Sequence, residues 1–216
     1  MRVDRLEVTG GVAFLVAAGL FAALAWGVEA RTPVVLTDAA ITQWMVAHRQ
    51  AAVTWVMIGI SAVHAPGWVA LWSACFGLVL LRLRERYWIV TLALAVGGGM
   101  LLNQGLKLLY RRARPVVDDP LVMLHSFSFP SGHTSAATSF YGVLAAYLVY
   151  AVRTPAERVA VIAGAVAAIA LVALSRVYLG AHYASDVVAA ACSSTVWLMA
   201  CLVGMHGLVR RRMEGR

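Results

Sequence analysis

The chain has 216 residues, of which 62% are hydrophobic and 13% are charged, and its mean hydropathy is +0.79. A soluble domain is about 45–50% apolar and about 25% charged, so the composition excludes one and indicates an integral membrane protein. The net charge of +8 does not indicate nucleic acid, because the cations are interleaved with segments that belong in hydrocarbon. Membrane lipids with anionic headgroups are the expected partners.

The first apolar run covers 10–28 and follows a short charged segment. It is too long for a signal-peptide core and has no convincing cleavage site before Glu29, so it predicts a first transmembrane helix. Residues 31–51 then carry apolar side chains at a spacing that favours a helix lying in the membrane interface. Thr37 or Asp38 is its expected N-cap.

The segment 53–81 is apolar but is interrupted at His64 and Pro66. It is either one kinked helix or a short turn followed by a helix from about Pro66. A third span is expected over 87–109, where the glycines at 97–99 would allow close helix packing.

A polar connection over 111–129 leads to three further predicted spans, at 131–152, 158–179 and 183–209. The sequence therefore predicts an all-α, polytopic bundle of six transmembrane helices with an interfacial helix after the first span. We expect residues 1–216 to form a single membrane-embedded domain, and its oligomeric state is open.

Six spans place both termini on one side of the membrane. With the N-terminus inside, eleven of the eighteen Lys and Arg residues are cytoplasmic. The other seven lie outside, and three of them belong to the polar clusters described next. Without those three, eleven cytoplasmic cations compare with four outer ones, which fits the positive-inside rule. We expect a plasma membrane protein, or an inner membrane protein in a cell with two membranes, with cytoplasmic termini and extracytoplasmic polar clusters.

The first polar cluster is Lys107 with Arg114 and Pro115. Lys107 is the only lysine in the chain and stands near the outer end of a span. Alone it would be a helix-end cation that reaches toward the interface. Pro115 turns the chain away from the span, so that Arg114 can return beside Lys107, and the pair suits a phosphate group.

The second cluster is Pro130-Ser131-Gly132-His133, at the start of the fourth predicted span. A helix N-terminus presents unsatisfied N–H groups to an anion, and Ser131 can cap the helix or donate to a phosphate oxygen. His133 can protonate a departing alkoxide. The alternative is a capped helix start with a surface histidine.

The third cluster contains Arg176, His182 and Asp186. The last two are four residues apart on one helix face, where a carboxylate can hold one imidazole nitrogen protonated and leave the other free to attack phosphorus. Two metal ligands at this spacing are the competing interpretation, without further carboxylates to support it. Arg176 adds a cation for the transition state.

The remaining histidines and the acidic residues of the polar connection are expected to have structural roles. His48, His64 and His206 are expected in interfacial or packing positions. Asp118, Asp119 and His125 belong to the polar connection, where a solvated loop is favoured over contact with a substrate headgroup.

The three clusters, over 107–186, resemble the complete signature of the type-2 phosphatidic acid phosphatase superfamily. The rest of the chain agrees with that family only in hydropathy. By this resemblance His182 is the nucleophile that forms a phosphohistidine, Asp186 orients it and His133 is the general acid. The resemblance assigns phosphate binding to Lys107, Arg114, Ser131, Gly132 and Arg176. It implies no metal and no cofactor.

The resemblance implies a lipid phosphatase acting at the extracytoplasmic face. Candidate substrates are undecaprenyl diphosphate, phosphatidylglycerol phosphate and phosphatidic acid, and the sequence does not rank them. Two alternatives stay open at this point. A phosphotransferase would pass the phosphate to an acceptor alcohol, and a non-enzymatic protein would only bind or carry a lipid phosphate.

Overall fold

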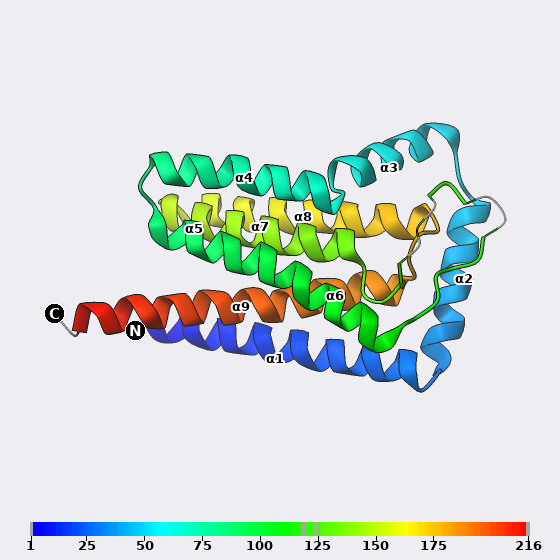
Figure 1. Ribbon diagram of the computed structural model, residues 1–216, viewed down its shortest axis with the longest axis horizontal. Helices are drawn as coiled ribbons and strands as arrows, with labels where there is room; N and C mark the ends of the chain where they lie inside the picture. The colour runs from blue at the N-terminus through cyan, green and yellow to red at the C-terminus, as the bar shows by residue number, and fades with distance from the viewer. Residues whose placement is uncertain (1, 118–119, 123, 125, 215–216) are drawn as a thin grey trace.

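The computed structural model describes residues 2–117, 120–122, 124 and 126–214, and these ranges contain helices and no strands. The helical elements are α1 (Arg2–Glu29), α2 (Pro33–Ala47), α3 (Ala51–Val63), α4 (Pro66–Arg82), α5 (Arg86–Leu92), the π-helix η1 (Ala93–Gly98), α6 (Gly99–Tyr110), α7 (Gly132–Ala151), α8 (Pro155–Tyr178) and α9 (Ala184–Glu214). Most of them lie along the long axis of the molecule, whereas α2 crosses one end (Figure 1). The predicted all-α class is confirmed.

Several of these helices can span a bilayer. Four described segments are long and apolar enough, Gly10–Glu29, Arg86–Tyr110, Pro155–Tyr178 and Ala184–Leu208, and a fifth results if α3 and α4 form one bent span. The chain is therefore a multi-pass membrane protein, as predicted. The remaining predicted span corresponds to α7, whose first half carries hydroxyl side chains, so the count of six stays a prediction.

The segment predicted to be kinked or to begin with a turn consists of two helices that meet at an angle of 56°. The part before Pro66 is the helix α3, so the alternative of a short turn is wrong. His64 ends α3 and its Nδ1 donates to Ile60 O at 2.8 Å. Pro66 then opens α4 at a position where its missing N–H costs nothing.

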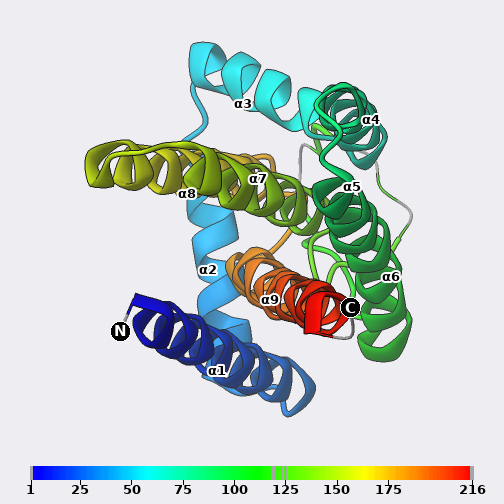
Figure 2. The same ribbon diagram turned by 90° about the vertical axis from the view of Figure 1, so that its left-hand side faces the viewer.

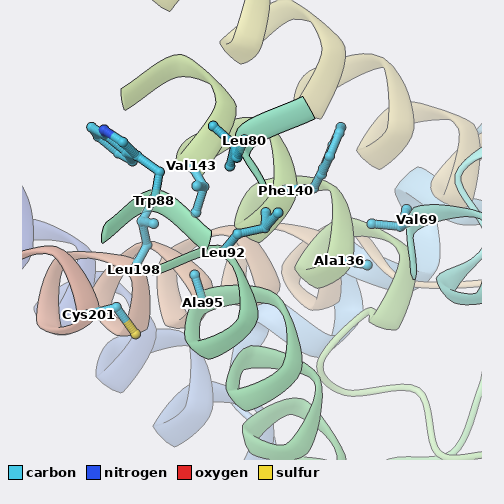
Figure 3. Close-up of a cluster of buried hydrophobic side chains, with 10 residues drawn as sticks. All are labelled: Val69, Leu80, Trp88, Leu92, Ala95, Ala136, Phe140, Val143, Leu198 and Cys201. Carbon is cyan, nitrogen blue, oxygen red and sulfur yellow. The ribbon is translucent and has the colours of Figure 1, made fainter. Parts of the chain in front are cut away.

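A core of apolar side chains joins α4, α5, η1, α7 and α9 (Figure 3). It consists of Val69, Leu80, Trp88, Leu92, Ala95, Ala136, Phe140, Val143, Leu198 and Cys201. The predicted close packing is confirmed at Gly98, where an added Cβ would lie 2.5 Å from Trp197 Cζ2, and at Gly99. It is wrong at Gly97, where a Cβ would meet nothing within 4 Å.

Helix α2 connects distant parts of the bundle. It contacts α1, α8 and α9, and in the end-on view it passes behind α9 from α1 toward α8 (Figure 2). Its N-cap is Thr32, which makes no side-chain capping hydrogen bond, so the prediction of Thr37 or Asp38 as the cap is wrong. Asp38 is instead buried within the protein.

Candidate active site

The three polar clusters of the sequence lie at one end of the bundle. The connection after α6, the start of α7, the end of α8 and the start of α9 all reach the end that α2 crosses, whereas the two chain termini lie at the opposite end (Figure 1). A hydrogen bond from Ser131 N to Asp186 O at 3.1 Å joins the second cluster directly to the third. The predicted convergence on one end of the molecule is therefore present.

His182 stands in the short connection between α8 and α9 and is 1% exposed, so the prediction that it shares a helix face with Asp186 is wrong. Its Nε2 accepts a hydrogen bond from Arg114 Nη1 at 3.2 Å, so the proton of the neutral ring is on Nδ1. Nδ1 lies 3.5 Å from Asp186 Oδ2. Burial lowers the pKa of His182 to about 4, against the opposing effect of Asp186. The imidazole is therefore neutral at pH 7, and Nε2 is the ring nitrogen that carries the lone pair.

Gly180 permits the turn that delivers His182. Its φ of +68° belongs to the left-handed region, where a side chain is strained. A Cβ at this position would also lie 3.1 Å from Arg49 Nη2. The connection is anchored by Arg49 Nε, which donates to Tyr178 O at 3.2 Å.

Asp186 lies in the first turn of α9 and is fully buried. Its Oδ2 accepts from the Ser128 hydroxyl and from Tyr183 N at 2.9 Å, and its Oδ1 accepts from Arg112 Nη1 at 2.6 Å. Both oxygens are thus occupied by N–H and O–H donors. This arrangement favours a carboxylate that orients His182 over one that ligates a metal ion.

Sequence reasoning missed two residues of this network. Arg112 belongs to none of the three predicted clusters, and Asp38 is predicted only as a possible helix cap. Arg112 Nη2 donates to Asp38 Oδ2 at 2.8 Å, which links α2 to the site. A lone carboxylate inside an otherwise apolar helix was the available signal for Asp38, because such a charge requires a partner when buried.

Two of the predicted phosphate-binding cations are held by backbone carbonyls. Lys107 is 5% exposed and its Nζ donates to Phe127 O at 2.5 Å. Arg114 donates from Nε to Ser126 O at 2.7 Å and from Nη1 to Ala181 O at 2.7 Å. Burial lowers the pKa of Arg114, and Asp186 opposes that shift. The connection after α6 therefore folds back, accepts from both cations and holds Arg114 beside His182.

Arg176 is the third predicted cation and is 1% exposed. Its Nη1 donates to the Ser61 hydroxyl on α3. Its Nε and Nη2 are buried and have no hydrogen-bond partner among the described residues. The backbone of Arg176 is close to the proposed nucleophile, since Arg176 O accepts from His182 N at 3.3 Å.

The start of α7 faces these cations. Ser131 is buried and caps the helix, since its Oγ accepts from Thr134 N at 3.5 Å. A Cβ on Gly132 would lie 4.0 Å from Lys107 Cε, which places this glycine opposite the lysine. His133 is half-buried, and the charges of Arg176, His182 and Arg114 act on it. All eight predicted site residues thus gather in one region.

The other singled-out histidines make ordinary contacts. His48 Nδ1 donates to Trp44 O at 2.8 Å. His64 Nε2 lies 2.7 Å from the Tyr141 hydroxyl, which ties the α3–α4 break to α7. His206 is exposed on α9. Asp118, Asp119 and His125 lie outside the described residues, so their assignment to a solvated loop stays a prediction.

An apolar groove with a volume of about 580 Å³ lies between α8 and α9. Ile41 and Met45 of α2 also line it. It reaches Val177 at the end of α8 and Ala184 at the start of α9, the two lining residues that bracket His182 in the chain. The groove therefore extends from the end that holds His182 along α8 and α9 into the bundle.

Comparison with known proteins identifies relatives of the chain. The profile of the PAP2 superfamily matches residues 86–210. Phosphatidylglycerophosphatase B of Bacillus subtilis is 37% identical over 153 residues, which cover 69% of this chain and 74% of that protein. Decaprenylphosphoryl-5-phosphoribose phosphatase of Mycolicibacterium smegmatis is 34% identical over 132 residues, which cover 58% of this chain and 63% of that protein.

Among solved structures, the chain is similar to a transmembrane PAP2-type phosphatidylglycerolphosphate phosphatase from Bacillus subtilis. The TM-score is 0.76 at 31% sequence identity, and the match covers 93% of this chain and 96% of that one. The likeness therefore extends beyond the residues matched by the family profile.

Proposed function

The chain belongs to the PAP2 superfamily and is a phosphoric ester hydrolase, and from that premise we propose that it removes a phosphate or diphosphate from a membrane lipid through a phosphohistidine. We treat residues 1–216 as one catalytic domain of six spans, with α7 as the sixth. Family membership speaks against the alternative of a protein that only binds or carries a lipid phosphate.

The observation that carries the proposal is the guanidinium of Arg176. A buried cation is costly unless it is paired and hydrogen-bonded, yet two of its nitrogens are without partners in the described part of the chain. Arg114 and His182 lie in the same interior. A phosphate oxygen would satisfy the open N–H groups and offset the positive charge, which supports an anion site next to the imidazole.

In the first step His182 Nε2 attacks phosphorus and forms an N–P bond. The bond from phosphorus to the lipid oxygen breaks, and the departing alkoxide takes a proton from His133. With a diphosphate the departing group is the lipid monophosphate. Asp186 accepts the hydrogen bond of Nδ1–H and stabilises the positive ring of the phosphohistidine. Lys107, Arg114, Arg176 and the N–H groups at the start of α7 hold the phosphoryl oxygens.

In the second step water attacks the phosphohistidine. The N–P bond breaks, Nε2 recovers its electron pair, and a proton of the water passes to His133, which restores the acid. The negative charge of the bound phosphate stabilises the protonated form of His133. Substrate binding therefore favours the acid that the first step requires. No step requires a metal ion, and we expect turnover to survive excess EDTA.

The groove between α8 and α9 supports a lipid as the substrate. Its apolar lining continues from the residues next to His182 toward membrane depth. Burial of each CH₂ of a lipid chain in such a lining contributes roughly 0.8 kcal/mol. The names of the relatives, which act on phosphatidylglycerophosphate and on a decaprenyl-linked phosphate, support both a diacyl and a polyprenyl chain as candidates.

We place the catalytic end on the extracytoplasmic side of the plasma membrane, or of the inner membrane in a cell with two. The support is the excess of predicted cytoplasmic cations, eleven of eighteen. Cysteine substitutions near Val116 and Arg84, labelled in intact cells with an impermeant thiol reagent, test this. Labelling at residue 84 alone would reverse the orientation.

The function is tested by phosphate release from purified protein in detergent. The panel contains undecaprenyl diphosphate, phosphatidylglycerol phosphate and phosphatidic acid, with glucose 6-phosphate as a soluble control and an added acceptor alcohol in a parallel series. We expect release from at least one lipid and little from the soluble ester. Equal rates on the soluble ester would contradict a lipid phosphatase, and phosphate transferred to the alcohol would indicate a phosphotransferase.

A further inference from the structure

A chain of three buried charges lies behind the proposed nucleophile. Arg112 Nη1 donates to Asp186 Oδ1 at 2.6 Å, and Arg112 Nη2 donates to Asp38 Oδ2 at 2.8 Å. Asp38 is 3% exposed and Asp186 is 0% exposed. Desolvation of such groups opposes folding and their pairing only offsets that cost, so stability alone does not account for a group of charges next to the proposed nucleophile.

Asp38 also holds the first turn of α9. Its Oδ1 accepts from Ser185 N at 2.9 Å, and its Oδ2 accepts from the Ser185 hydroxyl. That hydroxyl accepts in turn from Arg112 Nη1 at 2.7 Å. The guanidinium of Arg112 lies over the Tyr183 ring, 4.2 Å from its centroid. The residues on the N-terminal side of Asp186 are therefore fixed from α2, a helix that precedes the 86–210 region matched by the family profile.

We propose that Asp38 and Arg112 are positioning residues for the reaction. Arg112 fixes the carboxylate of Asp186 so that one oxygen faces His182 Nδ1, and Asp38 fixes Arg112. The inference rests on the proposed function, because it assigns both residues to the orientation of the proposed nucleophile. Both act through Asp186 and neither takes part in the chemical steps.

Two substitutions change the charge behind Asp186 in opposite directions. Arg112→Gln removes a positive charge, so Asp186 attracts protons on His182 more strongly and the imidazole becomes cationic at higher pH. Asp38→Asn removes a negative charge and leaves Arg112 uncompensated, so the imidazole becomes cationic at lower pH. Since only the neutral imidazole attacks, the acid limb of kcat/KM should move up in the first variant and down in the second.

Other charged groups also face this pair. Arg114 from the connection after α6 and Arg176 from α8 act on His182, and so does His133 from α7. Lys107 from α6 acts on Asp186. All of these groups are unchanged in both variants. Opposite shifts of the acid limb of kcat/KM would therefore report on Arg112 and Asp38.

The experiment measures phosphate release from dioctanoyl phosphatidic acid by the full chain in detergent, from pH 4.5 to pH 7.5. We expect kcat at pH 7 to fall about 10–100-fold in Arg112→Gln, with a smaller fall in Asp38→Asn. The ratio of kcat/KM at pH 4.5 to that at pH 7 should be lower than wild type in Arg112→Gln and higher in Asp38→Asn. The double variant should lose little beyond Arg112→Gln alone, because the residues act in series.

Arg111→Gln is the matched control. It removes the same charge from the adjacent, exposed residue, whose Nε donates only to Leu108 O at 3.0 Å. Its pH ratio should equal that of wild type. If Arg112→Gln does not fold, Arg112→Lys replaces it, and is expected to keep the wild-type ratio at a lower kcat, since an ammonium keeps the charge but not the two-sided fork.

The inference would be overturned if the ratio of kcat/KM at pH 4.5 to that at pH 7 changed in the same direction in Arg112→Gln and Asp38→Asn. It would also be overturned if both variants kept the wild-type ratio. These outcomes are distinct from a failure of the proposed function. If His182→Asn is inactive while the two ratios stay at the wild-type value, only the positioning roles are wrong. If His182→Asn retains turnover, the nucleophile itself is wrong.

Discussion

The end of the bundle that holds His182 and the half that holds Val143 are assembled from different contacts. Around Val143 the described side chains are apolar and pack at close range, as where Gly98 meets Trp197. Around His182 the contacts are hydrogen bonds and ion pairs among buried charges. The first region gains free energy from burial of apolar area, whereas the second loses hydration that its pairs only partly restore.

The difference separates stability from chemistry along the length of the molecule. Removal of a reacting group at the polar end should abolish turnover and leave the fold intact. An altered side-chain volume in the apolar half should weaken the fold and leave the catalytic rate of folded molecules unchanged. Four predictions test this division, beginning with the largest effect.

Replacement of His182 by Asn removes the proposed nucleophile and leaves a polar side chain of smaller size. We expect phosphate release to fall by at least roughly 10⁴-fold, because loss of a nucleophile leaves only binding and electrostatic stabilisation. The apparent melting temperature in detergent should stay near that of wild type. Appreciable turnover by the purified variant would remove the phosphohistidine from the mechanism.

Replacement of His133 by Gln removes the proposed acid. Turnover of a lipid alkyl phosphate should fall by about 10²–10⁴-fold. A 4-nitrophenyl phosphate ester should lose far less in the first step, since its leaving group needs no proton, and a burst of nitrophenolate would precede slow steady turnover. Equal losses in the rate of the first step for the two esters, measured in a single turnover, would argue against His133 as the acid.

Replacement of Gly98 by Ala tests the apolar half. The new Cβ would lie 2.5 Å from the rigid indole of Trp197, so we expect the free energy of unfolding to fall by about 1–3 kcal/mol. The matched control is Gly97→Ala, whose Cβ meets nothing within 4 Å. It should be neutral or stabilising, because alanine favours helix over glycine. Both variants should keep the wild-type kcat, and a large loss of kcat in folded Gly98→Ala would break the division.

Replacement of Ala173 by Phe fills the groove between α8 and α9, which this residue lines. We expect KM for a long-chain phosphatidic acid to rise several-fold, with little change for the dioctanoyl form, because a short chain buries less apolar area. Ala167→Phe is the control, on an exposed position of α8 that does not line the groove. Identical behaviour of the two variants would assign the lipid chain to another surface.

The sequence identified the local parts of both regions. Long apolar runs define the spans, and the four-residue spacing correctly predicts that His182 and Asp186 lie close together, although His182 precedes α9 and does not share its face. The three clusters were recognised because a cation or a carboxylate stands out against hydrocarbon. Only the geometry could show that they meet, since segments distant in the chain come together by packing that local pattern does not encode.

The parts that were not predicted depend on such packing. Arg112 is one of three arginines within four positions, and nothing local distinguishes the one whose guanidinium reaches both Asp38 and Asp186. Asp38 was assigned by its position near a helix start, but its helix begins at Pro33 and the carboxylate faces inward. Helix α7 corresponds to the predicted span at 131–152, but its hydroxyl-rich first half is buried inside the bundle and lowers its hydropathy, so its crossing of the membrane stays a prediction.

The two chain termini lie at the end opposite the proposed catalytic residues, and this has a practical consequence. A fluorescent reporter or an affinity tag fused to either end would sit a full bundle length from the site and leave the substrate's approach open. Molecules immobilised through such a tag would all present their reactive end to the bulk medium, in one orientation.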